Sequence, residues 1–552
     1  MPNYNLFDQR RCRCLSSNST RWPNSSVWQT FNQSIDGRLV SPLPSAAVCH
    51  STPVKFDACN TAITNWSNSS WRSDQVGAMQ SRNWENSLCS VFIWNSSCIQ
   101  GAVPTLAVNA TLPEHVEATV QIASTYNLRL VIKTTGHDYL GRSTANGSFL
   151  LWLHYMKNMT LIDQFTACGD TVSNAIRLSA GVQWGEAYAW LNQFNLTAVG
   201  GAYSTVSAAG GYLQGGGHSP LSRWKGLAAD NVLEFDVVTA DGRRETVNAC
   251  HNPDLFWALR GGGGGTFAIV LNVVLRTYPS PPVIAVILDM IPPNDRRYDN
   301  FVSDFVHFLP TLADRNWSGY FSFLDSNIVI VFMLPNGDAN VANATFHELL
   351  QNYIDFNFTL KLLFSMPSFN VFFNSVLAPS NATGANILLG SRLIPERIVR
   401  HEPHKVARTF IHVRKRRKNK ASLLGHLIAG GQVSNMNNNN SVNPVWRTAL
   451  IHMVYVVGWP DLTSKEKQQA LAKHLTRQVE ILQRVAGGDR SGCYMNEADP
   501  NEPNWQHKFF GTQAIYDRLK SIKNSVDPLG LFICRNCVGS DDWSSDLNCP
   551  KT

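Results

Sequence analysis

Glycine is concentrated between residues 200 and 219 more densely than an ordinary folded segment tolerates. It occupies positions 200, 201, 210, 211 and 215–217. Because glycine loses more conformational freedom on folding than any other residue, such density is expected where the backbone adopts positive φ or approaches a ligand closely. Tyr203, Val206 and Leu213 are interleaved with the glycines, which is not typical of a disordered linker. The segment therefore predicts backbone shaped around a bound molecule.

A second glycine motif lies in residues 133–143 (KTTGHDYLGRS). A buried strand that leads into the turn from Gly136 to Gly141 would expose successive backbone N–H groups, which can form an anion-binding concavity for a pyrophosphate. Arg142 and Ser143 add a positive charge and a hydrogen-bond donor. The alternative is an ordinary turn with a solvated histidine, His137.

A third glycine run, residues 261–265, invites comparison with a Rossmann dinucleotide loop. Its glycines follow a predicted helix over residues 254–259 rather than a strand, and no acidic residue occupies a suitable second strand. The sequence therefore disfavours a nicotinamide cofactor bound in that way.

Hydrophobic periodicity predicts a mixture of helices and short strands. Helices are predicted over residues 113–123, 184–194 and 254–259, and strands over residues 128–133, 233–239 and 328–333. Asn252 is predicted to cap the helix at 254–259. A capping box at Thr463 and Glu466 predicts a further helix that buries one face and ends at residues 487–488. The apolar residues of that face are Leu471, Leu475, Val479 and Leu482.

Composition indicates a globular protein with 44% hydrophobic and 16% charged residues. No apolar run approaches the roughly 20 residues that span a bilayer. The net charge is +7, but residues 414–420 (RKRRKNK) supply six positive charges. We interpret this run as a solvated loop, with nuclear import or polyanion binding as the alternative, and expect neither a nucleic-acid nor a membrane partner. The segment 398–430 is unlike its surroundings, as a mis-spliced gene model would be.

Cysteines gather at the two ends of the chain, six in the first hundred residues and four in the last sixty. Their spacings lack the paired partners of a zinc finger, so disulfides of open connectivity are expected and no metal centre. Many Asn-x-Ser/Thr sequons agree with an oxidising compartment. Residues 1–14 contain no apolar signal-peptide core, so we expect a secreted protein whose start is missing or misassigned. The sequons begin at Asn18, Asn24, Asn32, Asn65, Asn68, Asn95, Asn109, Asn146, Asn158, Asn195, Asn316, Asn343, Asn357, Asn381 and Asn439.

Further motifs complete a family pattern. They are residues 442–447 (VNPVWR), 493–499 (CYMNEAD), 502–506 (EPNWQ), 509–511 (FFG) and 527–532 (DPLGLF). Together and in this order with the glycine segments, they resemble the berberine-bridge-enzyme-like branch of the vanillyl-alcohol oxidase superfamily, as found in secreted fungal oxidases. The resemblance covers about residues 100–280 and 490–545.

The resemblance implies an α+β fold. Its parts would be a cysteine-rich extension (1–99), a PCMH-type FAD-binding domain of two subdomains (100–280), a substrate-binding domain built on an antiparallel sheet (281–485), and a C-terminal segment that returns to the FAD-binding domain (486–552).

The resemblance also implies FAD as the cofactor and places it residue by residue. His137 would bond covalently to the flavin 8α-methyl group, and Tyr494 and Asn496 would approach the flavin and the substrate. The implied cofactor contacts are Gly136, His137, Asp138, Gly141, Arg142, Ser143, Thr205, Val206, Gly210, Gly211, Gly215, His218 and Asn496.

One departure from the family pattern concerns the second covalent link. Many relatives carry a cysteine bonded to flavin C6 within a Gly-x-Cys-Pro-Thr-Val segment. Here Tyr203 replaces the cysteine and Ser204 the proline. A single histidyl link is therefore expected, with a lower flavin potential and narrower access to the ring.

The implied reaction is oxidation of a CH–OH group, in an alcohol or a carbohydrate, by hydride transfer to flavin N5. Tyr494 is the expected base, with an activating neighbour, because an unperturbed phenol has a pKa of about 10; the alternative is a purely structural tyrosine. Molecular oxygen is the expected acceptor and a monomer the expected state. Two other functions stay open, an oxidative cyclase or desaturase of secondary metabolism and a catalytically impaired secreted flavoprotein.

Overall fold

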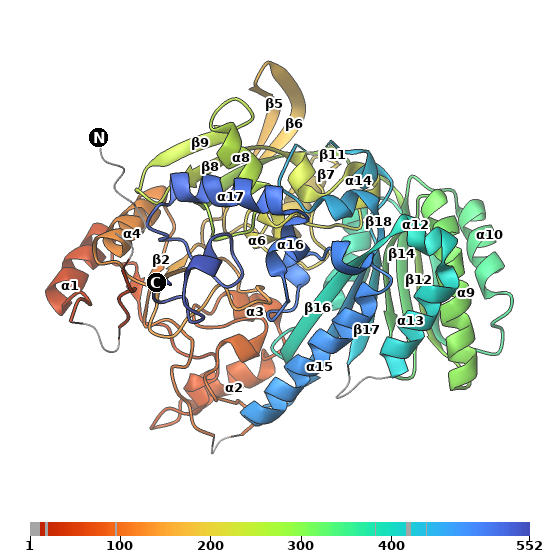
Figure 1. Ribbon diagram of the computed structural model, residues 1–552, viewed down its shortest axis with the longest axis horizontal. Coiled ribbons are helices and arrows are strands. Elements are labelled where there is room, and N and C mark those ends of the chain that lie inside the picture. Colours follow the sequence, from red (N-terminus) through yellow and green to blue (C-terminus); the bar gives the residue numbers. More distant parts are fainter. Residues whose placement is uncertain are drawn as a thin grey trace.

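The computed structural model (Figure 1) describes residues 11–16, 20–93, 96–380, 382–415, 421–437 and 439–551. The fold is α+β, with mixed and antiparallel sheets. The expectations for residues 1–10, for residues 416–420 of the basic run, and for the sequons at Asn18, Asn95 and Asn381 lie outside the described residues. Within the described ranges, no helix has the length and apolar character of a transmembrane helix.

The first sheet, of order β1-β2-β4-β3, carries the turn that ends at Gly141. Its inner strands are short and buried, and β4 pairs in parallel with both β2 and β3. Helix α4 connects β2 to β3 and buries Val116, Val120 and Ala123, as its 3.6-residue periodicity predicts. The elements are β1 (Leu39–Val40), β2 (Leu106–Asn109), α4 (Pro113–Thr125), β3 (Leu130–Lys133) and β4 (Phe149–Trp152).

The N-terminal residues do not form a separate layer. Strand β1 belongs to the first sheet, and Trp28 and Phe31 pack in the same hydrophobic cluster as Phe149. A disulfide joins Cys12 to Cys549, so the two ends of the chain are tied together. The α-helices described before β2 are α1 (Ser25–Ser34), α2 (Phe56–Thr64) and α3 (Ser69–Ser73).

The second sheet is antiparallel, of order β5-β6-β10-β8-β9, and its β5–β6 hairpin projects from the body (Figure 1). The glycine-rich segments at residues 200–219 and 261–265 lie between its strands, and the first of them contains the short helix α6. The elements of this part are β5 (Met159–Ala167), β6 (Asp170–Ser179), α5 (Trp184–Asn192), β7 (Leu196–Thr197), α6 (Gly211–Gln214), α7 (Ser222–Lys225), β8 (Val232–Val238), β9 (Arg244–Asn248), α8 (Pro253–Leu259), β10 (Ile269–Arg276) and β11 (Tyr278–Pro279). Strands β7 and β11 pair with each other in a separate two-stranded sheet.

The third sheet has seven antiparallel strands in the order β15-β12-β14-β13-β17-β18-β16. Helices α9, α10, α12 and α13 cover its side away from the first two sheets (Figure 1). Alternate residues of β12 divide between two cores, because Ile284 and Val286 face the helices while Val283 and Ala285 join the core of the second sheet.

The bounds of this part follow. The strands are β12 (Val283–Ile291), β13 (Ser318–Phe323), β14 (Ile328–Pro335), β15 (Asn357–Met366), β16 (Asn386–Pro395), β17 (Ser422–Leu427) and β18 (Ala449–Trp459). The helices are α9 (Asp295–Asp314), α10 (Ala339–Leu350), α11 (Phe369–Phe372), α12 (Glu396–His401), α13 (Pro403–Lys415), α14 (Gln432–Asn435) and α15 (Lys465–Gln483).

The C-terminal segment returns to the second sheet. Helices α16 (Trp505–Phe510) and α17 (Gln513–Val526) contribute Phe509, Phe510 and Leu519 to its core, and α17 lies against α8. This return brings residues near 494 and 534 to the glycine-rich segments.

The described part of residues 398–430, although unlike its surroundings in sequence, is integrated in the third sheet and its core. Strand β17 lies between β13 and β18, and α13 buries Val406 and Phe410 against the sheet. The solvated-loop interpretation fails for Arg414, which is buried, pairs with Asp295 and Asp299, and lies over the ring of Tyr298.

Two helix caps differ from expectation. The cap of α15 is Ser464, whose hydroxyl accepts from the N–H of Lys467, so the helix begins one residue later than a cap at Thr463 would require. Asn252 adopts a left-handed conformation, and its side chain donates to Glu245 instead of capping α8. In both places the local turn geometry, rather than the capping sequence motif, determines which hydrogen bond the side chain makes.

The expected disulfides are present. Besides Cys12–Cys549, the pairs are Cys49–Cys59, Cys89–Cys98, Cys168–Cys250 and Cys534–Cys537. Cys14 and Cys493 are buried free thiols.

Candidate functional site

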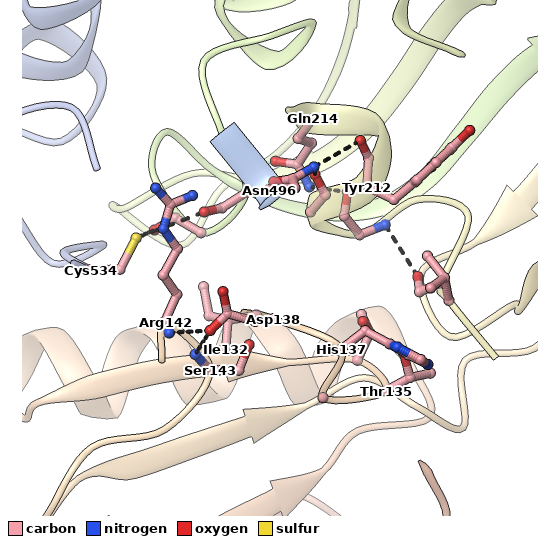
Figure 2. Close-up of a pocket in the computed structure, with 18 of the residues that line it drawn as sticks. Ile132, Thr135, His137, Asp138, Arg142, Ser143, Tyr212, Gln214, Asn496 and Cys534 are labelled. Atoms are coloured by element: carbon pink, nitrogen blue, oxygen red, sulfur yellow. Dashed lines mark hydrogen bonds between the residues drawn. The ribbon is translucent and has the colours of Figure 1, made fainter. Parts of the chain in front are cut away.

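A cavity lies where the turn after β3, the glycine-rich segments and the C-terminal segment meet. In Figure 2 the turn, with His137, Asp138 and Arg142, forms one side, and Gln214 and Asn496 lie opposite. Segments distant in sequence therefore share one space. Its wall includes Thr134, Thr135, Gly136, His137, Asp138, Tyr139, Arg142, Ser143, Tyr203, Val206, Gly210, Gly211, Gln214, Gly264, Gly265, Tyr494, Asn496, Glu497, Phe532 and Cys534.

His137 stands at one end of this cavity, opposite Arg142 and Cys534 (Figure 2). Its Nε2 lies 2.7 Å from the hydroxyl oxygen of Thr205, and its ring meets that of Tyr203 edge-on at 5.6 Å. Burial lowers the pKa of His137 to about 3, so the imidazole is neutral near pH 7. Hydrogen bonds among the described residues leave Nδ1 without a partner.

The turn that follows His137 divides its backbone donors into two groups. The carboxylate of Asp138 accepts from the N–H groups of Leu140 (3.1 Å), Arg142 and Ser143 (3.3 Å). The N–H groups of residues 136–139 make no hydrogen bond to a described residue. The backbone N–H groups of the first half of the turn are therefore available to bind an anion, whereas Asp138 already occupies N–H groups of the second half.

Arg142 lines the cavity, but its guanidinium is engaged by the C-terminal segment. It donates to the carbonyl oxygens of Arg535 (2.9 Å) and Asn536 (3.0 Å). Burial lowers its pKa from the ordinary value. Arg142 thus fastens residues 535–536, beside the Cys534–Cys537 disulfide, against the turn.

Two glycines leave room that a side chain would fill. A Cβ placed on Gly211 or Gly265 would meet no atom within 4 Å, and both glycines line the cavity. A Cβ on Gly264 would come within 2.8 Å of the Gly211 Cα, so the two segments pack this closely only because position 264 has no side chain. Such a backbone-lined slot fits an extended dinucleotide such as FAD.

Asn496 joins the C-terminal segment to α6. Its amide donates to the carbonyl oxygens of Gly211 (2.8 Å) and Tyr212 (3.3 Å) and to the hydroxyl of Tyr494 (2.7 Å). A Cβ on Gly215 would lie 2.5 Å from this amide, which explains the glycine there. Burial raises the pKa of Tyr494, and Glu497 raises it further. Among the described residues that shift this pKa there is no cation of the kind an activated phenol needs.

Four of the residues expected at the cofactor lie behind the cavity wall. A Cβ on Gly141 would meet the ring of Trp84 at 2.4 Å, so this glycine serves packing. Thr205 supports His137, and Gly215 supports Asn496. His218 contacts Glu497, with its Nε2 3.1 Å from Oε1.

Sequence reasoning missed several residues of the wall. Gly264 and Gly265 belong to the third glycine run, whose position after a helix argues against a Rossmann loop but does not predict a place in the cavity wall. Phe532 ends the motif at residues 527–532, Cys534 lies two residues beyond it, and Glu497 follows Asn496 in the motif at 493–499. Except for Cys534, each of these residues lies within a segment that the sequence indicates, so the signal is present at the level of the segment.

Sequence comparison finds two known families in this chain. The family described as "FAD binding domain" matches residues 104–248, and the one described as "Berberine and berberine like" matches residues 493–538. These two segments supply most of the cavity wall.

Similar proteins extend over almost the whole chain. An uncharacterized FAD-linked oxidoreductase of Arthroderma benhamiae is 38% identical, covering 98% of this chain and 96% of its own. A VAO-type flavoprotein oxidase of Thermothelomyces thermophilus is 32% identical, over 97% and 94%. The crystal structure of a VAO-type flavoprotein from Myceliophthora thermophila C1 superposes with a TM-score of 0.89 at 30% identity, covering 98% of this chain and 100% of that one.

Proposed function

The chain belongs to the FAD-linked oxidoreductases of the vanillyl-alcohol oxidase superfamily, with a berberine-bridge-like C-terminal segment, and from this premise we propose that it holds FAD covalently through His137 and oxidises the CH–OH group of a small alcohol or carbohydrate. The observation that carries the proposal is the placement of His137. A neutral imidazole stands at the end of a glycine-lined slot, with Nε2 held by Thr205 and Nδ1 without a partner.

The slot would hold the cofactor by its backbone. The N–H groups of residues 136–139 would bind the pyrophosphate, and Gly211 and Gly265 would let the dinucleotide lie against the main chain. Arg142 would close the slot by fastening the C-terminal segment, and its buried charge favours the phosphate anion. Bound FAD supplies hydride acceptance at N5, and the chain supplies position and electrostatics.

The histidyl link would be the single covalent bond to the cofactor. Tyr203 stands where many relatives carry a cysteine, and its ring lies in the cavity wall beside His137. A phenol at this position cannot form the thioether, and its ring narrows the approach to that end of the slot.

Tyr494 and Asn496 would contact the substrate. Asn496 fixes the Tyr494 hydroxyl at 2.7 Å, and both residues line the cavity. The hydroxyl donates to the carbonyl oxygen of Tyr212 at 3.3 Å and would turn this proton to the oxygen of the reacting CH–OH group, so orienting it for hydride transfer. We infer that molecular oxygen accepts the electrons, which the oxidase name of the Thermothelomyces relative supports. We also infer that the protein is secreted and monomeric.

The test combines two measurements on the purified protein. After acid precipitation the pellet should stay yellow in the wild type and in His251→Ala, which changes an exposed histidine, and turn colourless in His137→Ala. A panel of primary alcohols, secondary alcohols and oligosaccharides should then yield hydrogen peroxide in air for at least one compound.

Two results would contradict parts of the proposal. Flavin that stays in the supernatant of wild-type protein would rule out the covalent link. Flavin that is bleached anaerobically by none of the hydroxyl compounds would rule out the alcohol-oxidase function and favour the cyclase, desaturase or impaired-enzyme alternatives.

A further inference from the structure

Three histidines and one glutamate meet beside the cavity, and we propose that they bind a divalent transition-metal ion. The group consists of His218, His426, His452 and Glu497 and is called the histidine cluster below. One ligand atom from each lies within 4.8 Å of every other. This inference goes beyond the proposed oxidoreductase function and does not depend on it.

The distances within the histidine cluster suit a small ion. His218 Nε2 is 3.1 Å from Glu497 Oε1, the Nδ1 atoms of His426 and His452 are 3.1 Å apart, and His452 Nδ1 is 3.7 Å from Glu497 Oε2. In a tetrahedral zinc site with bonds of about 2.0–2.1 Å, ligand atoms are about 3.3–3.4 Å apart. Small rotations of the side chains would place all four donor atoms at bonding distance from one central ion.

Rigid elements bring the four donors together. His426 and His452 face each other on adjacent strands, β17 and β18, as register partners. His218 follows α6 in the glycine-rich segment, and Glu497 ends the short helix Met495–Glu497 of the C-terminal segment. The ion would therefore join three parts of the molecule, the FAD-binding part, the third sheet and the C-terminal segment.

Buried aromatic residues surround the three imidazoles, while Glu497 reaches the cavity. The three histidines are buried, and the rings of Tyr320, Trp446 and Tyr494 pack around them at 5.1–6.3 Å. Within the cluster Glu497 supplies the single carboxylate.

The ring nitrogens are poorly served by hydrogen bonds alone. The contact between two Nδ1 atoms needs one to carry a proton and the other not. The opposite ring nitrogens, His218 Nδ1 and His452 Nε2, are buried without a hydrogen-bond partner among the described residues, so hydrogen bonds to these residues do not fix the orientation of either ring. Convergent imidazole nitrogens with one carboxylate are a donor set that suits zinc and its neighbours in the first transition row.

The histidine cluster adjoins the cavity and shares one residue with its wall. Glu497 lines the cavity, whereas the three histidines do not. The sequence predicts no metal centre because the four residues stand up to 279 positions apart and form no recognisable spacing motif. Only the pairing of β17 with β18 and the return of the C-terminal segment bring them together.

The experiment measures metal on the flavin-loaded protein. The protein is stripped with a chelator, titrated with Co²⁺, and followed by visible absorption in difference mode against the flavin, with metal stoichiometry determined by mass spectrometry. We expect one Co²⁺ per chain, displaced by one Zn²⁺, and d–d bands of a four-coordinate site. His426→Ala and Glu497→Gln should reduce the affinity at least tenfold.

A matched control uses the other close histidine pair, His307 and His404, whose Nε2 atoms are 3.3 Å apart on the surface. His307→Ala/His404→Ala should bind Co²⁺ as the wild type does. Loss of binding in this control but not in His426→Ala would overturn the proposal, as would wild-type protein that takes up less than a tenth of an equivalent. That result would leave a purely hydrogen-bonded cluster.

A second readout does not depend on any variant. Crystals of Zn²⁺-loaded wild-type protein, measured on both sides of the zinc absorption edge, should show an anomalous peak about 2 Å from the cluster nitrogens. A map without that peak would contradict the proposal even if the variants misfold. Flavin absorbance, recorded on the same samples, reports the cofactor independently, so failure of the metal site and failure of the proposed function can be told apart.

Discussion

Replacing Thr205 with valine tests how the chain prepares His137 for its bond to the flavin. Thr205 is buried, and its hydroxyl oxygen lies 2.7 Å from His137 Nε2. For Nδ1 to act as the bonding nitrogen it must offer a lone pair, so the ring proton must reside on Nε2. The hydroxyl oxygen of Thr205 must then accept a hydrogen bond from this N–H group. Valine keeps the shape of threonine but cannot accept.

The size of the effect follows from the hydrogen bond that is lost. A buried polar group left without its partner costs about 1–3 kcal/mol. Because this hydrogen bond holds the imidazole in the reactive tautomer and orientation, the rate of covalent flavin incorporation should fall about five-fold to about 150-fold. The bound but non-covalent flavin should remain, because the backbone of the slot is unchanged.

The assay adds FAD to flavin-free protein and follows the acid-precipitable fraction of flavin with time. Thr205→Ser, which keeps the hydroxyl, is the matched control and should stay within about twofold of the wild type. Incorporation by Thr205→Val at the wild-type rate would refute the role given to this hydrogen bond.

Four further predictions address the slot, the link and the C-terminal segment. Gly211→Leu should fill the slot, since a Cβ there meets nothing within 4 Å, and flavin absorbance per chain should drop while the circular dichroism spectrum is kept. Covalent incorporation should be independent of pH between 5 and 8, because the pKa of His137 is lowered to about 3 by burial; a decline centred near pH 6.5 would indicate an ordinary imidazole. Tyr203→Cys should allow a second link, seen as acid-stable flavin in the Tyr203→Cys/His137→Ala double variant. Glu502→Ala should lower the free energy of unfolding in urea by about 3–5 kcal/mol, because it leaves the guanidinium of Arg392, 2.7 Å away, buried and unpaired.

Elements with strong periodicity could be predicted closely from the sequence. The helix expected at residues 113–123 is α4, and the strand expected at 328–333 is β14, because an apolar face or an apolar run determines each. Helix caps were less predictable. Ser464 rather than Thr463 caps α15, since either hydroxyl suits the motif and only the turn geometry selects one.

The site was predictable where its chemistry is local in sequence. His137 with its turn and the glycine segments all reach the cavity, because each segment bends around the same space. Contacts between distant segments were not predictable. The bond from Arg142 to residues 535–536 and the meeting of His218 with His426 depend on how the C-terminal segment and the third sheet dock, which no local pattern encodes.

The identity of the residue that carries the flavin tests the central claim most directly. Protease digestion of acid-precipitated protein, followed by tandem mass spectrometry, locates the flavin on a peptide. We predict a flavin-bearing peptide that contains residues 134–142, with fragment ions assigning the added mass to His137 and none to Tyr203. Assignment to another residue, or a peptide 134–142 of unmodified mass in a protein that nevertheless binds flavin, would contradict the account.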